Sequence, residues 1–133
     1  MTKASDTANI LKQPFTNTLG TSNYRAGVNA GDTIASGGNY NVTIGDEAGT
    51  ALTTGDSNVA IGYTALDAED AGSGNTAIGY RALTAQDGAD NNLAIGFDAG
   101  LSISTGGLNS FVGSYSGSTM TLGTANVALG YAT

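Results

Sequence analysis

Six asparagines recur along this chain at one constant interval, 17 positions apart, and each opens a stretch whose fourth residue is aliphatic and whose fifth is glycine. The stretch at residues 58–62, Asn-Val-Ala-Ile-Gly, is typical of the six. A fixed period this short indicates a stacked architecture rather than a globular domain. The asparagines are Asn41, Asn58, Asn75, Asn92, Asn109 and Asn126.

The length of the unit restricts what each repeat can contain. A helical-hairpin repeat needs about 33 residues, so a helical solenoid is excluded. Over residues 58–66 the side chains alternate with a period of two, which predicts a strand. A small residue recurs later in each unit, and we expect a turn with positive φ there. The sequence therefore predicts an all-β fold, a parallel β-solenoid with two short strands and two turns in each coil. The expected turn positions are Gly38, Gly55, Gly72, Ala89, Gly106 and Gly123.

If each unit is one coil, equivalent residues stack in columns at the spacing of neighbouring strands, about 4.8 Å. We expect the uninterrupted aliphatic column to be the centre of the hydrophobic core, with the small column from Ala48 to Thr133 beside it. The glycine column from Gly45 to Gly130 predicts the close approach of another backbone or ring. The aliphatic column consists of Ile44, Ile61, Ile78, Ile95, Val112 and Leu129.

The asparagine column allows two kinds of interpretation. Stacked asparagines can hydrogen-bond along the solenoid axis, and asparagine also tolerates left-handed turn conformations. Both of these roles are structural. A ladder of exposed amides that binds a ligand is the alternative, and the pattern alone does not separate the two.

An aromatic column follows the glycine column, with Asp46 and Ser114 as its exceptions. The rings either cap the coil's own core or contact a partner. A coil this short has a thin interior and carries apolar residues on both faces, which favours a homo-oligomer that supplies the missing core. The aromatic residues are Tyr63, Tyr80, Phe97 and Tyr131.

The repeat extends to residue 23 if one extra residue is allowed, which gives six coils and a final strand in a domain of residues 23–133. That strand, in residues 126–133, either caps the solenoid itself or is covered by another chain. Residues 1–22 do not fit the repeat and carry a charge of +1, against −8 for the remainder, which sums to the net −7. We expect them to anchor the protein through their apolar side chains, and a disordered tail is the alternative. The anchor residues are Ile10, Leu11, Phe15 and Leu19.

Composition excludes several classes of function. The chain has no cysteine and no histidine, so thiolate nucleophiles, zinc–thiolate sites and histidine bases are absent. The carboxylates lie in variable turns and form no column, so we predict a non-enzymatic protein without a cofactor or a metal. Four basic residues against 11 acidic ones argue against a nucleic-acid partner. No apolar run is long enough for membrane insertion, and no secretory signal opens the chain, so we expect synthesis in a cytoplasm without export by that route.

The units at Asn58, Asn75 and Asn92 resemble the head repeats of trimeric autotransporter adhesins of the YadA type, whose units are somewhat shorter. The resemblance covers about residues 41–133. It implies a left-handed parallel β-roll that assembles as a homotrimer and displays a surface for attachment. Because the unit is longer here, the turn after the second strand should be longer too.

The form Asn-Thr-Ala-Ile-Gly-Tyr-Arg-Ala-Leu at residues 75–83 is similar to repeats in structural proteins of bacteriophages, and the first nine residues are similar to the start of tail-fibre proteins of marine phages. This resemblance implies a virion protein such as a short fibre, a spike or a capsid-decorating protein. Residues 1–22 would bind other virion proteins, and the solenoid would contact a glycan or protein of the host surface. The alternatives are the head fragment of an adhesin on the bacterial cell surface and a tailspike enzyme that cleaves polysaccharide.

Overall fold

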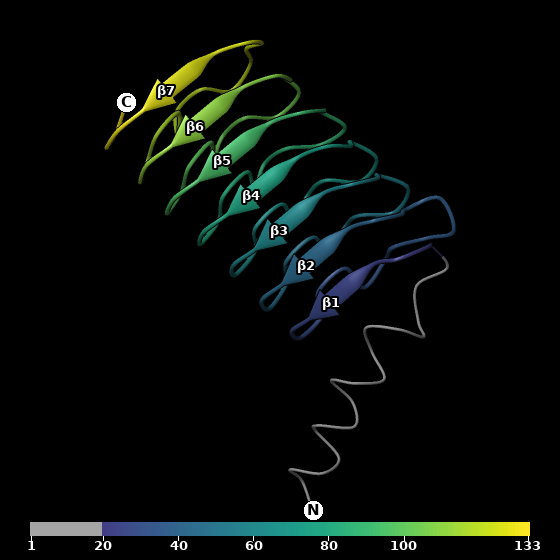
Figure 1. Cartoon of the computed structure of the whole chain (residues 1–133). Helices are drawn as coiled ribbons and strands as arrows, with labels where there is room; N and C mark the ends of the chain where they lie inside the picture. The colour runs from purple at the N-terminus through teal and green to yellow at the C-terminus, as the bar shows by residue number, and fades with distance from the viewer. Residues whose placement is uncertain (1–19) are drawn as a thin grey trace, which may run out of the picture.

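The computed structural model describes residues 20–133, which form a single parallel sheet of seven strands in sequence order (Figure 1). Each strand has three residues, and a long connection leads from each of the first six to the start of the next strand. The strands are β1 (Tyr24–Ala26), β2 (Val42–Ile44), β3 (Val59–Ile61), β4 (Thr76–Ile78), β5 (Leu93–Ile95), β6 (Ser110–Val112) and β7 (Val127–Leu129).

The pairing of neighbouring strands follows the sequence repeat. Ala60 pairs with Ala77, and Ile61 pairs with Ile78, so residues 17 positions apart lie directly over one another. The same register holds between every pair from β2 to β7. Each repeat unit is therefore one coil of a β-solenoid, as predicted.

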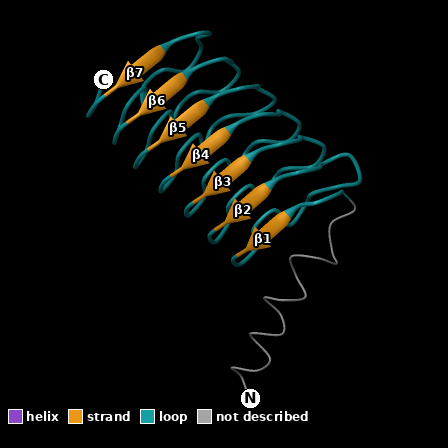
Figure 2. Cartoon of the chain, in the orientation of Figure 1, coloured by secondary structure: helices purple, strands orange, loops and turns teal. Residues whose placement is uncertain are grey.

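The second half of each coil differs from the prediction, because it contains turns and bends instead of a second strand (Figure 2). Left-handed conformations interrupt it: Thr64 has a φ of 50° and Leu66 a φ of 54°. Such residues cannot belong to a regular strand. Coil-to-coil hydrogen bonds continue all the same, as from Leu66 N to Ala82 O at 3.0 Å.

The predicted core column is wrong, because the strands turn their other side inward. The middle residue of every strand from β1 to β6 is buried, and Ala60, Ala77 and Ala94 are 0% exposed. The aliphatic side chains of the predicted column point outward, and Leu129 at the last strand is 73% exposed. A period of two separates the two faces of a strand but does not say which face is inside. The outward-facing residues are Ile44, Ile61, Ile78, Ile95, Val112 and Leu129.

The interior combines alanines with a second column of complementary size. Ala48, Ala65, Ala82 and Ala99 are 0% exposed, so this part of the predicted small column does lie in the core. The residue after each member of this small column and the residue three positions further on have complementary volumes. Where the first residue of the pair is glycine, the residue three positions later has a large apolar side chain. Where the first is leucine, the residue three positions later is Glu or Gln. The pairs are Gly49 with Leu52, Leu66 with Glu69, Leu83 with Gln86, Gly100 with Ile103 and Gly117 with Met120.

Two glycine columns are required for different reasons. Gly62 has a φ of +130°, and a Cβ there would lie 2.5 Å from the carbonyl oxygen of Gly79, so the predicted close approach is by the next coil's backbone. Gly55, at an expected turn position, does not have positive φ. A Cβ on Gly55 would instead clash with the Gly72 carbonyl oxygen and lie 2.9 Å from Asn58 Nδ2. The left-handed residue of this turn is Ser57, with a φ of 59°.

Coil geometry begins before Asn23, since Tyr40 N donates to Thr21 O at 2.9 Å. Ser22, with a φ of 58°, adopts the same left-handed conformation that Ser57 has before its own asparagine. The expected anchor residues Ile10, Leu11, Phe15 and Leu19 lie outside the described residues. Within residues 20–133 there is no helix with the length and apolar character needed to cross a membrane.

Candidate interaction surface

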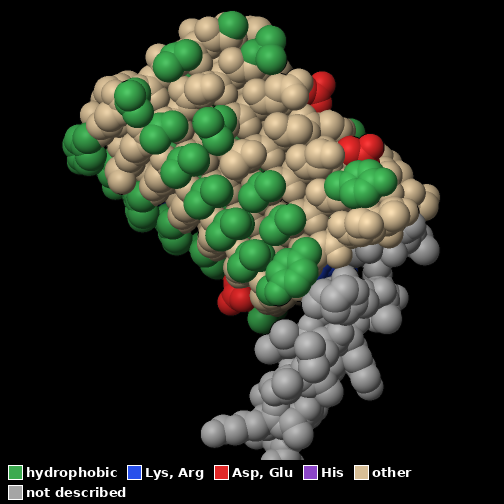
Figure 3. All heavy atoms as spheres, in the orientation of Figure 1, with side chains coloured by type: hydrophobic (Ala, Val, Ile, Leu, Met, Phe, Trp, Pro, Cys, Tyr) green, Lys and Arg blue, Asp and Glu red, His purple; other side chains and the backbone are tan. Residues whose placement is uncertain are grey.

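The outward side of the sheet, termed the strand face, consists of the first and third residues of each strand. No charged residue occupies these two columns. Figure 3 shows hydrophobic side chains in parallel rows on the side toward the viewer, with carboxylates only at the borders. Ile95 is 37% exposed even though it is flanked by strands on both sides. Between β2 and β6 the other aliphatic side chains of this face are half-buried. Rows of aliphatic side chains that stay partly exposed are typical of a surface that a partner covers.

A second feature, termed the ring ladder, runs along the border where the strands end. Tyr63 and Tyr80 stack with their ring centroids 5.5 Å apart, and Tyr80 and Phe97 stack at 4.9 Å. Tyr115 continues the ladder toward Tyr131 in place of Ser114, one position later than the repeat predicts. All five rings are between 38% and 76% exposed. The ladder lies outside the buried core, and the shifted Tyr115 is the member that sequence analysis missed.

An ion pair accompanies the ladder. Arg81 Nε donates to Asp98 Oδ1 at 2.9 Å, and Arg81 Nη2 donates to Asp98 Oδ2 at 2.6 Å. The hydrogen bond to Asp98 raises the pKa of Arg81. The guanidinium carbon also lies 5.2 Å from the ring centroid of Tyr80, within the range of a cation–π contact. The charge of Arg81 is thus engaged within its own chain.

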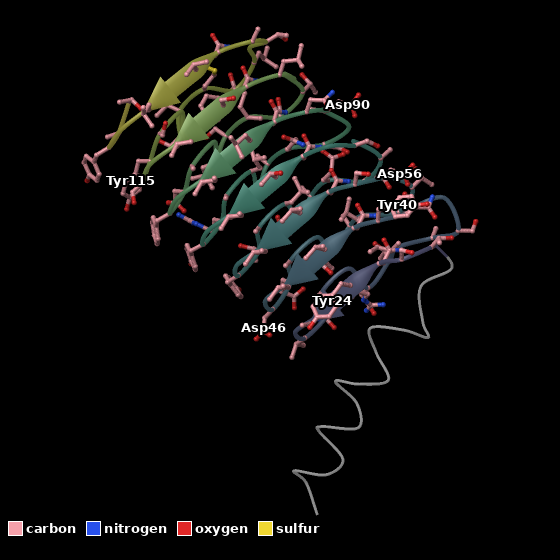
Figure 4. All side chains as sticks on the ribbon, viewed as in Figure 1. Tyr24, Tyr40, Asp46, Asp56, Asp90 and Tyr115 are labelled. Carbon is pink, nitrogen blue, oxygen red and sulfur yellow. The ribbon has the colours of Figure 1, made fainter. Side chains whose placement is uncertain are left out.

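The opposite border, before the strands, is polar and is termed the carboxylate border. Asp56 Oδ1 accepts from Asn39 N at 2.7 Å, Asp56 N donates to Ser73 Oγ at 3.0 Å, and Ser73 N donates to Asp90 Oδ1 at 2.7 Å. Figure 4 shows Asp56 and Asp90 at the end of the strands away from Tyr115. The expectation that the acids form no column is therefore wrong for Asp56 and Asp90, which share a column with Ser73 between them.

The asparagine ladder lies inside the coil. Asn75 N donates to Asn58 Oδ1 at 2.9 Å, and Asn75 Nδ2 donates to Ala89 O at 2.7 Å. From Asn41 onward, bonds from amide to amide occur only at the last two steps, from Asn109 to Asn92 and from Asn126 to Asn109. The members from Asn41 to Asn109 are at most 1% exposed. Their amides are consumed by structural hydrogen bonds and are not available to a ligand.

A buried polar network that sequence analysis missed joins two coils. Glu69 is 0% exposed, and its carboxylate accepts from Gly72 N at 2.5 Å, Gly88 N at 2.8 Å and Gln86 Nε2 at 2.8 Å. Gln86 Oε1 in turn accepts from Asn92 Nδ2 at 2.9 Å. The exchange of volume with Leu66 and Leu83 was the available signal, because only a core position is subject to it.

The pKa of the Asp67 carboxyl is raised above its ordinary value. Desolvation by burial raises the pKa of Asp67, and the nearby charge of Glu47 raises it further. Backbone hydrogen bonds from Asp67 and Ala68 lower it in part. The Asp67 Oδ1 atom is buried and has no hydrogen-bond partner.

We searched residues 20–133 for clusters of side chains that could bind a metal ion. No group of three or more Asp and Glu residues there lies close enough to hold a metal ion. No family model, no curated protein and no solved structure matches the chain. The candidate site is therefore a surface, made of the strand face and its two borders.

Proposed function

We propose that this chain is a non-enzymatic structural protein of a bacteriophage virion, such as a short fibre, a spike or a capsid-decorating protein. The solenoid forms a homotrimer that projects from the particle, where it can contact the host surface. Residues 1–22 attach it to other virion proteins. The protein is made in the host cytoplasm and resides in the virion.

The observation that carries the proposal is the uncharged strand face. Its aliphatic side chains stand in register over six coils, and a partner must match this repeat to cover them. A second copy of the same chain has the same repeat in the same register, so identical copies fit best. The inward strand position is only an alanine in β3, β4 and β5, so burial of the aliphatic strand face would add apolar core to a thin interior.

The number of copies and the hand of the coil come from the resemblance to YadA-type heads. The strand of the Asn-x-Ala-Ile-Gly unit, with small residues inside and aliphatic residues outside, suits three copies around a common axis. A left-handed coil is part of the same proposal. The location in a virion is supported by the similarity of residues 75–83 to phage structural repeats.

Particle association tests the proposed location. The full chain and a variant without residues 1–19 are expressed in infected cells of the source host, and each lysate is sedimented. Residues 20–22 are kept, because Thr21 pairs with the first coil. The full chain should sediment with the particles, and the shortened variant should stay in the supernatant as a folded oligomer. A shortened chain that still sediments with particles refutes the anchoring role, and a full chain absent from particles refutes the virion assignment.

A head domain of a bacterial surface adhesin is the second candidate. The observation that favours it is the row of exposed tyrosine rings beside the strand face, a feature able to contact a receptor. Detection of the protein on intact bacterial cells, in the absence of phage particles, would support this candidate over the virion protein.

A further inference from the structure

The strand face is bordered by two unlike edges. Tyr115 of the ring ladder lies beyond the carboxyl ends of the strands, and Asp56 and Asp90 lie beyond their amino ends (Figure 4). Each edge follows the coil repeat of the sequence, apart from the shift of Tyr115 by one position. When copies surround a common axis with their strand faces inward, the edges of each copy meet the edges of its two neighbours.

The ring ladder leaves only certain groups free. The ring faces of Tyr63, Tyr80 and Phe97 are covered by one another, because neighbouring planes differ by only 18° and 11°. The three side chains remain 41–50% exposed, and no hydrogen bond within residues 20–133 uses the hydroxyl of Tyr63 or Tyr80. Aromatic edges are the electropositive part of a ring. The ladder therefore offers two hydroxyl donors and positive ring edges to whatever lies beside it.

The carboxylate border offers the complement. Asp56 and Asp90 use Oδ1 to accept hydrogen bonds within the chain. No hydrogen bond or ion pair in the described part of the chain uses the Oδ2 atom of either residue. Both arginines of the solenoid are paired elsewhere, with Asp32 and Asp98. The border thus presents two carboxylate oxygens without a partner, on Asp56 and Asp90, which lie two coils apart with Ser73 between them.

We propose that the ring ladder of one copy packs against the carboxylate border of the next copy, so that all copies run parallel in a closed ring. This inference rests on the proposed homo-oligomer and specifies its flanks. An antiparallel pair would set ladder against ladder and carboxylates against carboxylates, and like charges at close range are destabilising. The parallel arrangement places acceptors of the next copy beside the hydroxyls of Tyr63 and Tyr80.

In a ring of parallel copies, equivalent residues of all copies lie at the same height along the solenoid axis. This determines which residue of the carboxylate border faces each ring of the ladder. Tyr63 lies seven residues after Asp56 and ten residues before Ser73, so Asp56 of the next copy is nearer in height. The Tyr63 hydroxyl then donates to Asp56. One coil further along, Tyr80 faces Ser73, and the edge of Phe97 faces Asp90.

Directed cross-linking tests this arrangement, and the absence of cysteine gives a clean background. The full chain carries Ser73→Cys, Tyr80→Cys or both, and each protein is treated with a short bismaleimide and run on a denaturing gel. The double variant should cross-link to a covalent closed oligomer, and each single variant should stay uncross-linked. Cross-linking by Tyr80→Cys alone would show that like borders meet and would overturn the proposal.

A second measurement, of the dissociation constant of the oligomer, uses a variant that keeps the aromatic ring, unlike Tyr80→Cys. Tyr63→Phe should raise the dissociation constant of the oligomer at least about threefold, as should Asp56→Asn, and the double variant should lose little more than either single one. Additive losses would contradict the pairing. The native mass distinguishes failure of the proposed homo-oligomer from failure of the border pairing. A monomeric wild type refutes the homo-oligomer itself. An oligomer without cross-links between positions 73 and 80 refutes only the pairing of its borders.

Discussion

A single residue type, asparagine, connects each coil to its neighbours and to its own turn. The Oδ1 atom of Asn75 accepts from the backbone of the next coil, and its Nδ2 atom donates to the turn at Ala89. The backbone N–H that it accepts belongs to the buried Asn92. Buried polar groups that lose a partner cost more than the bond itself contributes.

Asn75→Ala should therefore lower the free energy of unfolding by about 2 kcal/mol or more, because it leaves Asn92 N–H without an acceptor. Urea unfolding followed by circular dichroism measures this change. The exposed Thr105→Ala is the control and should stay within about 0.5 kcal/mol of the wild type. An Asn75→Ala protein as stable as that control would contradict a structural role for the ladder.

Asp67 gives a pH-dependent prediction at the same scale. Its folded-state pKa is raised by desolvation and by Glu47, so its stabilising contribution is present at low pH and is lost as the pH rises through the raised value. Asp67→Asn removes a desolvated charge, and its Tm at pH 7 should exceed that of the wild type. The difference should disappear near pH 3.

The matched control for Asp67→Asn is Asp46→Asn. Asp46 is exposed and accepts a backbone hydrogen bond that asparagine can also accept. Its Tm should follow that of the wild type at both pH values. A Tm advantage of Asp67→Asn that persists unchanged at pH 3 would rule out the charge as its cause.

The elements of the coil are held together by volume matching across its narrow interior. Phe111 occupies a position where the three preceding coils have alanine, and glycines on both sides make room for it. A Cβ on Gly100 would lie 2.9 Å from Phe111 Cδ2, and a Cβ on Gly117 would lie 2.5 Å from Phe111 Cδ1. The ring and the two glycines therefore form one packing unit.

Phe111→Ala should cost about 3–5 kcal/mol, and Gly100→Ala should cost about 1 kcal/mol or more because its φ is +60°. The double variant should cost less than the sum, by about 1 kcal/mol, since the methyl group then enters space left by the ring. A double-mutant cycle from urea unfolding measures this coupling. Strict additivity would show that the two positions do not share space.

The coil was predictable from the sequence, whereas its inside and outside were not. A column of aliphatic residues suggests a core, but the inward strand position holds alanine at Ala60 and Ala77, and the large buried side chains come mainly from the second half of the coil. Ile61 and Ile78 are consequently outside. The asparagine hydrogen bonds could be anticipated as a class. The Glu69–Gln86 contact also follows the repeat, but it is recognisable only once the inward positions of the coil are known.

The molecule as a whole is a short solenoid with one uncharged side, and the proposed assembly depends on that side. Ile78→Asp places a charge at the centre of the strand face, where burial in an interface would remove it from water at a large cost. The variant should be a folded monomer, because Ile78 is only partly buried within its own chain. Sedimentation velocity and circular dichroism provide the two readouts.

Ala85→Asp is the matched control, because it adds the same charge at an exposed position in the second half of a coil. It should keep the assembly of the wild type. If Ile78→Asp also keeps that assembly, the strand face is not the interface.

The native mass of the full chain in solution is the most direct test of the central claim, that the strand face is covered by identical copies. Sedimentation equilibrium over a wide range of concentrations measures it without assumptions about shape. The proposed homotrimer predicts three times the chain mass of 13.1 kDa. A mass of 13.1 kDa at every concentration would contradict it.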